Sequence, residues 1–197
     1  RPIAGMGVAN DDGVNFTSGT LTTNRINLFN GNITGANNIT LGIGGTSSTV
    51  IQISQSASTV MGGSLDASPI YNFGTGGHTV LYLEEPVSRN TGFEIPSGRV
   101  LAALSIDNTK GITLVGGNLS VGNLTLTNGN INTSASNVLG FGGTNNTGSE
   151  DSYINGPVAR EIPANQITGT TFSFPTGKAG SGYYPFDLVD ATTIGGT

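Results

Sequence analysis

The sequence predicts an all-β protein folded as a right-handed parallel β-solenoid, a three-sided β-helix with about 20 residues per rung, where a rung is one full turn of the coil. Three observations support this. A long segment occurs twice, apolar pairs recur inside it at shorter and nearly equal intervals, and the composition favours strands over helices. A β-sandwich, which also uses many short strands, is the alternative. Equal intervals favour the solenoid because a sandwich does not require them.

The long repeat is visible in two stretches that read nearly alike. Residues 19–33 read GTLTTNRINLFNGNI and residues 117–131 read GNLSVGNLTLTNGNI. Ile26 then matches Leu124. A fixed long period is typical of proteins in which each unit buries its apolar face on a neighbour. We therefore divide the chain into an entry rung (1–18) that continues from an upstream unit, a first solenoid unit (19–116) and an incomplete second unit (117–197).

A weaker match extends the repeat with a small slip. Residues 71–76 match residues 172–177, a slightly larger offset, whereas the intervening stretches 47–70 and 145–171 match poorly. Prolines cluster in or beside these poorly matched segments. Because proline is excluded from central strand positions, we expect loops, edges or a small excursion from the rod there.

Short strands are predicted wherever apolar and small polar residues alternate with a period of two. Threonine and valine favour strands, while glycine and asparagine end them. The pairs Asn30-Gly31 and Asn128-Gly129 are strong tight-turn signals. The clearest predicted strands are 104–106, 112–114, 119–121, 124–126 and 139–141.

A shorter period lies inside the long one. Leu104 and Ile106 recur as Leu124 and Leu126, which matches a rung of about 20 residues. Three short strands per rung, with inward side chains stacked from rung to rung, satisfy this spacing. Nine or ten such rungs would form a rod of roughly 45 Å. The other recurring positions are Ile112 with Ile131, Leu119 with Leu139, Val121 with Phe141, and Leu21 with Leu41.

The composition excludes several functional classes. The chain has 197 residues, with 32 glycines, only 10% charged residues and no cysteine, so it has no disulfide framework. Its net charge of −5 with seven basic residues disfavours nucleic-acid binding. No apolar run is long enough to span a bilayer, so membrane insertion is not expected. The sequence shows no leader and opens without methionine, and we interpret it as a piece of a longer protein.

Two pairs of adjacent carboxylates are candidate calcium ligands. Asp11 with Asp12, and Glu150 with Asp151, lie in loops rich in glycine and asparagine, where backbone carbonyls are free to complete a calcium shell. Neither pair has EF-hand spacing, and solvated loop charges are the favoured interpretation of both. We therefore expect no required cofactor, with calcium as the one candidate.

The remaining reactive residues do not form a recognisable catalytic set. His78 is the single histidine, and the chain lacks the partners of a zinc site or a hydrolytic triad. It is interpreted as an ordinary loop or strand-end residue, and Glu84-Glu85 as solvated loop charges. Carboxylates are nearly absent from the regular strands, which disfavours a polysaccharide-cleaving solenoid. The sequence therefore predicts no enzyme activity.

Tyr183 and Tyr184 form the densest aromatic cluster, together with Pro185 and Phe186. Exposed aromatic side chains can stack on sugars or anchor partners, so these two tyrosines are candidate ligand-binding residues. A small satellite core beneath a loop is the competing interpretation, and we favour it.

Residues 124–143, together with 152–158, 174–178 and 182–186, resemble the repeat-bearing cell-surface proteins of the Bacteroidota. Those are large secreted proteins that commonly end in a type IX secretion sorting domain. The later segments are similar to the family pattern Y-v-x-G-P-v, F-P-v-G-k and Y-r-P, although Tyr184 stands where a basic residue is common. The resemblance implies an extracellular, cell-surface location and a role in adhesion, filaments or gliding. It implies no catalytic residues.

These observations together predict a structural segment of a large secreted cell-surface adhesin or filament, a stiff repeat rod without catalysis. The alternative is an adhesin module that binds glycans or surfaces, with calcium as a candidate stabilising ion. An uncapped rung presents unpaired backbone groups, so self-association or end-to-end stacking is the expected mode of assembly.

Overall fold

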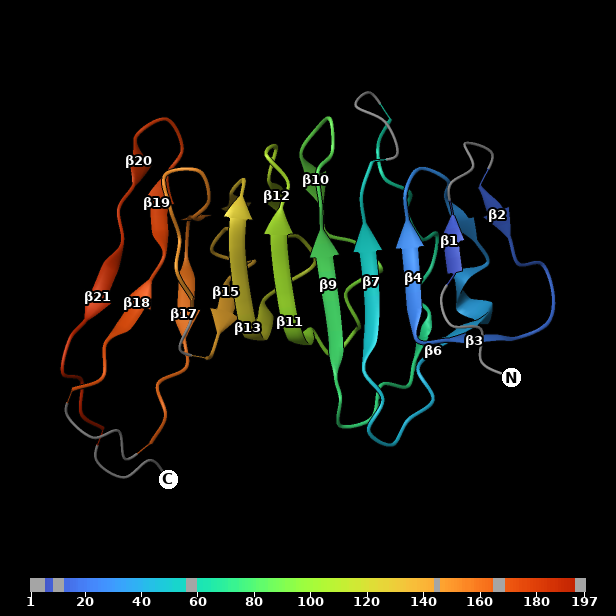
Figure 1. Ribbon diagram of the computed structural model, residues 1–197, viewed down its shortest axis with the longest axis horizontal. Helices are drawn as coiled ribbons and strands as arrows, with labels where there is room; N and C mark the ends of the chain where they lie inside the picture. Colours follow the sequence, from blue (N-terminus) through green and yellow to red (C-terminus); the bar gives the residue numbers. More distant parts are fainter. Residues whose placement is uncertain (1–5, 9–12, 56–59, 144–145, 165–168, 194–197) are drawn as a thin grey trace.

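The computed structural model describes residues 6–8, 13–55, 60–143, 146–164 and 169–193. Parallel strands lie side by side along a rod, with the first strands of the chain at one end and the C-terminal strands at the other (Figure 1). The fold is a β-solenoid of about seven turns, which confirms the predicted fold class. The predicted nine or ten turns were too many, because several rungs are longer than the predicted rung.

The first side of the rod is an eight-stranded sheet in which every neighbouring pair is parallel. Antiparallel sheets packed face to face, which a β-sandwich would require, are not formed by these strands. In spatial order the strands are β1 (Met6–Val8), β4 (Arg25–Leu28), β7 (Thr49–Ile53), β9 (His78–Tyr82), β11 (Val100–Asp107), β13 (Leu119–Asn128), β15 (Leu139–Phe141) and β17 (Val158–Arg160).

The other two sides are built from shorter strands. The second side is a six-stranded sheet: β10 (Arg89–Asn90), β12 (Ile112–Thr113), β14 (Ile131–Asn132), β16 (Ile154–Asn155), β19 (Thr176–Lys178) and β20 (Gly182–Tyr183). Earlier in the chain, β2 (Val14–Asn15) pairs with β5 (Ile33–Thr34). The third side contains β3 (Leu21–Thr23), β6 (Ile39–Leu41) and β8 (Ile70–Tyr71), with one 3₁₀ turn, η1 (Ala36–Asn38), before β6.

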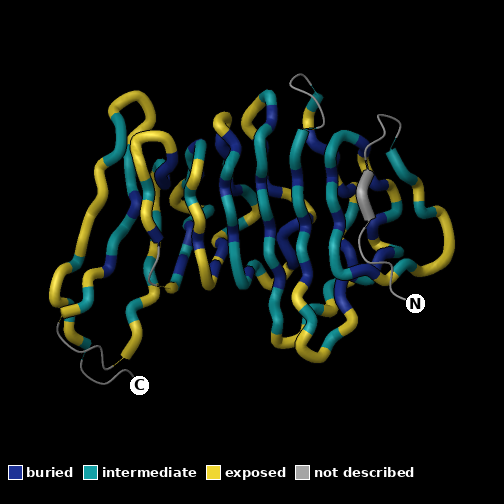
Figure 2. Tube along the Cα trace, in the orientation of Figure 1, coloured by how far each residue is buried: buried dark blue, intermediate teal, exposed yellow. Residues whose placement is uncertain are grey.

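The core consists of columns of apolar side chains that run along the rod. Residues in β7 and β9 alternate between buried and half-buried, as expected for strands with one face inside. The buried positions form a line of dark segments across the strands in Figure 2. One column passes through five paired strands and consists of Ile26, Ile51, Val80, Leu104 and Leu124, none more than 2% exposed.

The predicted pairing is confirmed in the second half of the chain. Leu104 pairs with Leu124 and Ile106 with Leu126, as the short period indicated. The same holds for Ile112 with Ile131, Leu119 with Leu139 and Val121 with Phe141.

The predicted pairing of Leu21 with Leu41 is wrong. Leu21 pairs with Ile39 and Leu41 pairs with Thr23, a shift of two positions that leaves the same faces inward. A shift of two is compatible with the alternation of strand side chains, which is why the apolar pattern alone did not reveal it.

The C-terminal end of the rod departs from the parallel pattern. Strand β18 (Phe172–Phe174) pairs antiparallel with β21 (Phe186–Leu188), and β19 pairs antiparallel with β20. We call residues 172–188 the C-terminal cap. Its sequence counterpart in the first unit, Tyr71 in β8, instead pairs in parallel with Leu41.

The cap packs on the last rung through aromatic side chains. The ring of Phe174 lies 6.3 Å from that of Phe141 and 5.5 Å from that of Phe186, measured between centroids. The guanidinium of Arg160 lies 5.2 Å from the Phe141 ring and 5.3 Å from the Phe172 ring, within cation–π range. The cap therefore continues the apolar interior beyond the last strands of the eight-stranded sheet.

Candidate functional site

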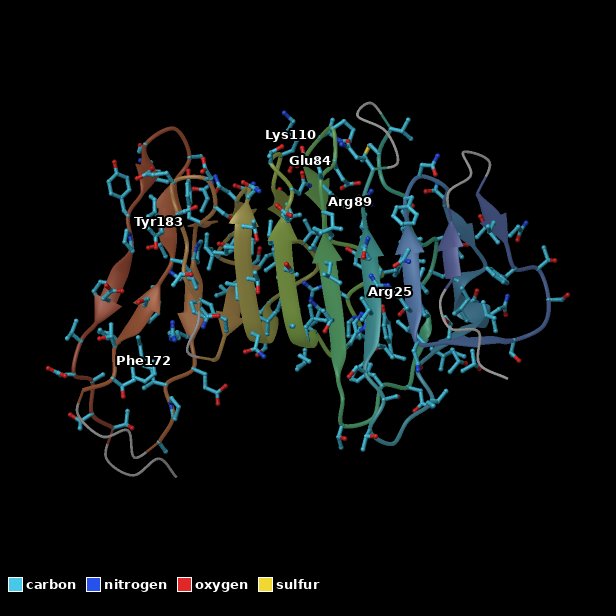
Figure 3. The ribbon with its side chains drawn as sticks, viewed as in Figure 1. Arg25, Glu84, Arg89, Lys110, Phe172 and Tyr183 are labelled. Carbon is cyan, nitrogen blue, oxygen red and sulfur yellow. The ribbon has the colours of Figure 1, made fainter. Side chains whose placement is uncertain are left out.

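Polar side chains interrupt the apolar interior near the middle of the rod. His78 begins β9, Glu85 and Arg89 lie on the connection into β10 and at its start, and Glu94 follows β10. All four are buried, and the most exposed of them, Arg89, is 9% exposed. Figure 3 shows Arg89 in the central part of the rod. We call these four residues the polar layer. Burying such groups is costly unless each has a partner.

His78 uses both of its ring nitrogens. Its Nδ1 lies 2.8 Å from the hydroxyl oxygen of Thr49, which is directly opposite on β7, and its Nε2 lies 3.0 Å from the carbonyl oxygen of Glu94. The ring also packs against Tyr71 and Phe73, at centroid distances of 5.0 and 5.9 Å. His78 is thus a strand-end residue, as predicted, but it is an interior one.

The carboxylate of Glu94 accepts hydrogen bonds from inside the rod. Its Oε1 accepts from the hydroxyl of Tyr82 and, at 2.6 Å, from the backbone N–H of Gly92. Burial, together with the nearby charge of Glu94, raises the pKa of the Tyr82 hydroxyl well above its usual value. Burial lowers the pKa of His78 to about 4 against the opposing effect of its backbone hydrogen bonds, so its ring is neutral at pH 7.

Glu85 and Arg89 form a buried ion pair. The Arg89 guanidinium donates to both carboxylate oxygens, from Nε and Nη2, each at 2.7 Å. Both residues also bind Gly62: its N–H donates to Glu85 at 2.7 Å and its carbonyl accepts from Arg89. Burial alone would lower the pKa of Arg89. The hydrogen bond to Glu85 and the charge of Glu85 have the larger effect, so the pKa of Arg89 is raised. The pair therefore fastens the segment around Gly62 to the rod.

The polar groups of this layer have hydrogen-bond partners inside the protein. The histidine nitrogens, the Tyr82 hydroxyl and the Glu85 carboxylate are all engaged by neighbouring groups, and their atoms are buried. A catalytic group must reach a substrate, and these groups point into the core. This arrangement supports a structural role for the polar layer. The layer holds together the rungs that carry the longest loops.

An open pocket of about 410 Å³ lies beside the polar layer. Buried Thr91, Ile95 and Pro96 are among its lining residues, Phe93 is exposed over 48% of its surface, and Arg99 is half-buried. The ordered turn from Pro96 to Arg99 is closed by the Arg99 N–H, which donates to the Pro96 carbonyl at 2.8 Å.

Arg99 has an unusual backbone and an unusual set of partners. Its φ of 53° lies in the left-handed region, which non-glycine residues rarely occupy. Its Nε donates to the carbonyl of Asn118 at 3.1 Å, and Nη2 donates to those of Val115 and Gly117 at 2.8 and 2.9 Å. Partial burial lowers the pKa of Arg99.

Within the described residues, the predicted calcium ligands do not form one cluster. Asp11 and Asp12 lie outside the described residues. Glu150 accepts a hydrogen bond from the Tyr183 N–H at 3.1 Å, and the Asp151 carbonyl accepts one from the Gly129 N–H at 2.7 Å. Within the described ranges, no group of three or more acidic or histidine side chains is placed to hold a metal ion. Calcium binding stays a prediction.

The two candidate ligand-binding tyrosines have different surroundings. Tyr183 is half-buried and lies against Tyr153, at a ring-centroid distance of 6.4 Å. Tyr184 is 60% exposed, and its hydroxyl donates to the carbonyl of Ser181 at 2.9 Å. Figure 3 shows Tyr183 at the C-terminal end of the rod, far from Arg89. Tyr183 thus packs as expected for a small satellite core, whereas the side chain of Tyr184 is exposed and accessible to a ligand.

Sequence reasoning missed the polar layer. The interpretation of Glu85 as a solvated loop charge is wrong, because its carboxylate is buried against Arg89. A signal was present: charged residues make up only 10% of the chain, yet five of them fall between Glu84 and Arg99. The members of this group are Glu84, Glu85, Arg89, Glu94 and Arg99.

In the part of the chain that the structure describes, no helix is long and apolar enough to cross a membrane. No protein-family model matches the chain, and neither the curated proteins nor the solved structures contain a match to it.

Proposed function

We propose that the chain is a structural rod segment of a large secreted cell-surface adhesin or filament. The observation that carries this proposal is the continuous column of apolar side chains from Ile26 to Leu124, which joins successive rungs along the axis. A solenoid of this kind gains stability from each added rung and holds its two ends apart. The polar groups of the interior serve the packing of the rod.

The resemblance of residues 124–143 and 182–186 to secreted surface proteins supports the extracellular part of the proposal. The composition is in accord with it, since low charge and abundant asparagine, threonine and glycine suit short solvent-facing strands and tight corners.

The rod proposal predicts that the segment is replaceable. In the parent protein, an unrelated β-solenoid with the same number of rungs should preserve surface display and assembly. Antibody labelling of intact cells measures display, and electron microscopy measures the length of the surface structures. Loss of function after this exchange, with display intact, would show that the segment has a specific binding role. Labelling that appears only after cell lysis would contradict the surface location.

A binding role at the C-terminal cap is the second candidate, and the exposure of Tyr184 favours it. Phe186, 55% exposed, lies two positions further along, so two aromatic rings are accessible on one segment. Aromatic faces of this kind bind sugars. Binding to a glycan array should be lost in Tyr184→Ala and kept in Val100→Ala, which removes an equally exposed apolar side chain elsewhere. Equal binding by both variants would exclude this site.

A further inference from the structure

The pocket beside the polar layer contains a guanidinium without a carboxylate partner. Among the described residues the one ion pair joins Glu85 and Arg89, and Arg99 is not part of it. Arg99 contributes Nε and Nη2 to three backbone carbonyls, whereas its Nη1 has no hydrogen-bond partner among the described residues. Nη1 lies at the pocket wall, since a Cβ added to Gly116 would be 3.3 Å from it.

An aromatic ring lines the same pocket. Phe93 is 48% exposed although its neighbours Glu94 and Ile95 are buried, and its backbone is held in place by the Tyr71 hydroxyl, which donates to the Phe93 carbonyl at 2.7 Å. The exposed hydroxyl of Ser97 lies on the pocket lining as well. The pocket thus combines an aromatic face, one free cationic nitrogen and a hydroxyl.

We infer that this pocket binds a singly anionic pyranose unit of an acidic glycan. The apolar face of a sugar ring stacks on Phe93, and its anionic group accepts a charge-assisted hydrogen bond from Nη1 of Arg99. A pocket of about 410 Å³ falls within the range of small-molecule sites. The anionic group is a carboxylate, as in a uronic acid, or a sulfate ester, since each carries one negative charge.

A purely structural role of Arg99 explains less of the geometry. Its three bonds to carbonyls fasten the turn at residues 115–118, but they leave Nη1 unused and do not account for the exposed ring of Phe93. The left-handed backbone of Arg99 is strained relative to glycine, and strain of this kind is frequent at binding sites. This site is separate from Tyr184 and does not depend on the rod function.

The test is a titration of the whole isotope-labelled chain with glucuronate, glucose 6-sulfate and glucose, followed by NMR. Both anionic sugars, or one of them, should shift the amide signals of residues 91–99 and 115–116, and comparison of the two identifies the anionic group. Glucose should bind at least about tenfold more weakly, because it lacks the charge-assisted bond. Equal affinity for glucose, or the absence of shifts at these residues, would overturn the assignment.

Two variants separate the ligand contacts from the fold. Phe93→Ala removes an exposed ring. Arg99→Gly removes the cation at a position whose positive φ glycine adopts without strain. Each should weaken binding at least about tenfold, while circular dichroism reports an intact fold. The matched controls are Lys110→Gln and Ile43→Ala, which remove an exposed cation and an exposed apolar side chain elsewhere. Controls that weaken binding as much as the pocket variants would show non-specific association.

Discussion

His78 illustrates how one interior residue links the stability of the rod to pH. Its neighbours are the hydroxyl of Thr49, the carbonyl of Glu94 and the rings of Tyr71 and Phe73, so the titratable residues in contact with it are Tyr71 and Glu94. Because burial lowers its pKa from 6.5 to about 4, the unfolded chain binds a proton that the folded chain does not bind in this interval.

The free energy of unfolding should therefore fall as the pH falls from 6.5 towards 4, by up to about 1.4 kcal/mol per pH unit from His78 alone. Urea denaturation at pH 7, 6 and 5 measures this slope. His78 is the single histidine of the chain, so His78→Gln should be less stable at pH 7 but should lose most of the slope between pH 6.5 and 5. An unchanged slope in the variant would contradict the buried neutral state.

Substitutions at Glu85 and Arg89 should have strongly non-additive effects on the free energy of unfolding. Arg89→Met leaves the Glu85 carboxylate buried without its partner and should cost about 3–5 kcal/mol. The double variant Glu85→Leu/Arg89→Met should lose much less than the sum of the single changes, because neither charge remains. A double-mutant cycle by urea denaturation measures the coupling. Lys110→Gln, at an exposed position, serves as the control and should change stability by no more than about 0.5 kcal/mol.

At the scale of single elements, the corners decide where each strand ends. The predicted tight turn at Asn128-Gly129 lies at the end of β13, and Gly129 has a φ of 79°. A Cβ added there would lie 1.7 Å from the carbonyl oxygen of Asn108 on the preceding rung. Glycine at this corner is therefore required twice, by the backbone conformation and by the contact between rungs.

Gly129→Ala should destabilise the chain by more than about 2 kcal/mol, because the added methyl group displaces the backbone of two rungs. Gly98→Ala is the matched control, since no heavy atom lies within 4 Å of its added Cβ and its φ is not positive. The control should be neutral or slightly stabilising, by about 0.5 kcal/mol. Thermal unfolding monitored by circular dichroism compares the two, and equal melting temperatures would show that the corner can relax.

Strand pairing was predictable where rungs are regular. The pairing of Leu104 with Leu124 follows from an uninterrupted repeat of the short period. Ile51 pairs with Val80 over a longer interval, because an excursion lies between them, and no periodic pattern reveals the length of such an excursion. Similarly, Glu85 was interpreted as a solvated charge because its burial depends on Gly62, which a local pattern does not place beside it.

At the scale of the molecule, the two ends of the rod differ. The eight-stranded sheet ends at β17, and the C-terminal cap, with its two antiparallel strand pairs, lies at this end, with Phe172 only 3% exposed. The predicted end-to-end stacking requires an open rung, so the cap should prevent stacking at this end. The antiparallel cap was not foreseen because its sequence resembles residues 71–76, which occur in the parallel part.

A variant that ends at residue 171 lacks the cap and should self-associate, because the aromatic surface around Phe141 becomes accessible and β16 loses its parallel partner β19. Sedimentation velocity over a range of concentrations measures the oligomeric state, with the full chain as the comparison. A truncated variant that stays folded and monomeric at all concentrations would contradict the capping role.

The direction of the strands relative to the rod has a mechanical consequence. The strands run across the rod axis, so the hydrogen bonds between rungs lie along the axis, and under tension applied at the two ends the ladders break one after another. A rung such as that from Leu104 to Leu124 releases roughly 70 Å of extended chain when it peels away. A tether built in this way lengthens in small successive steps and dissipates mechanical energy at each step.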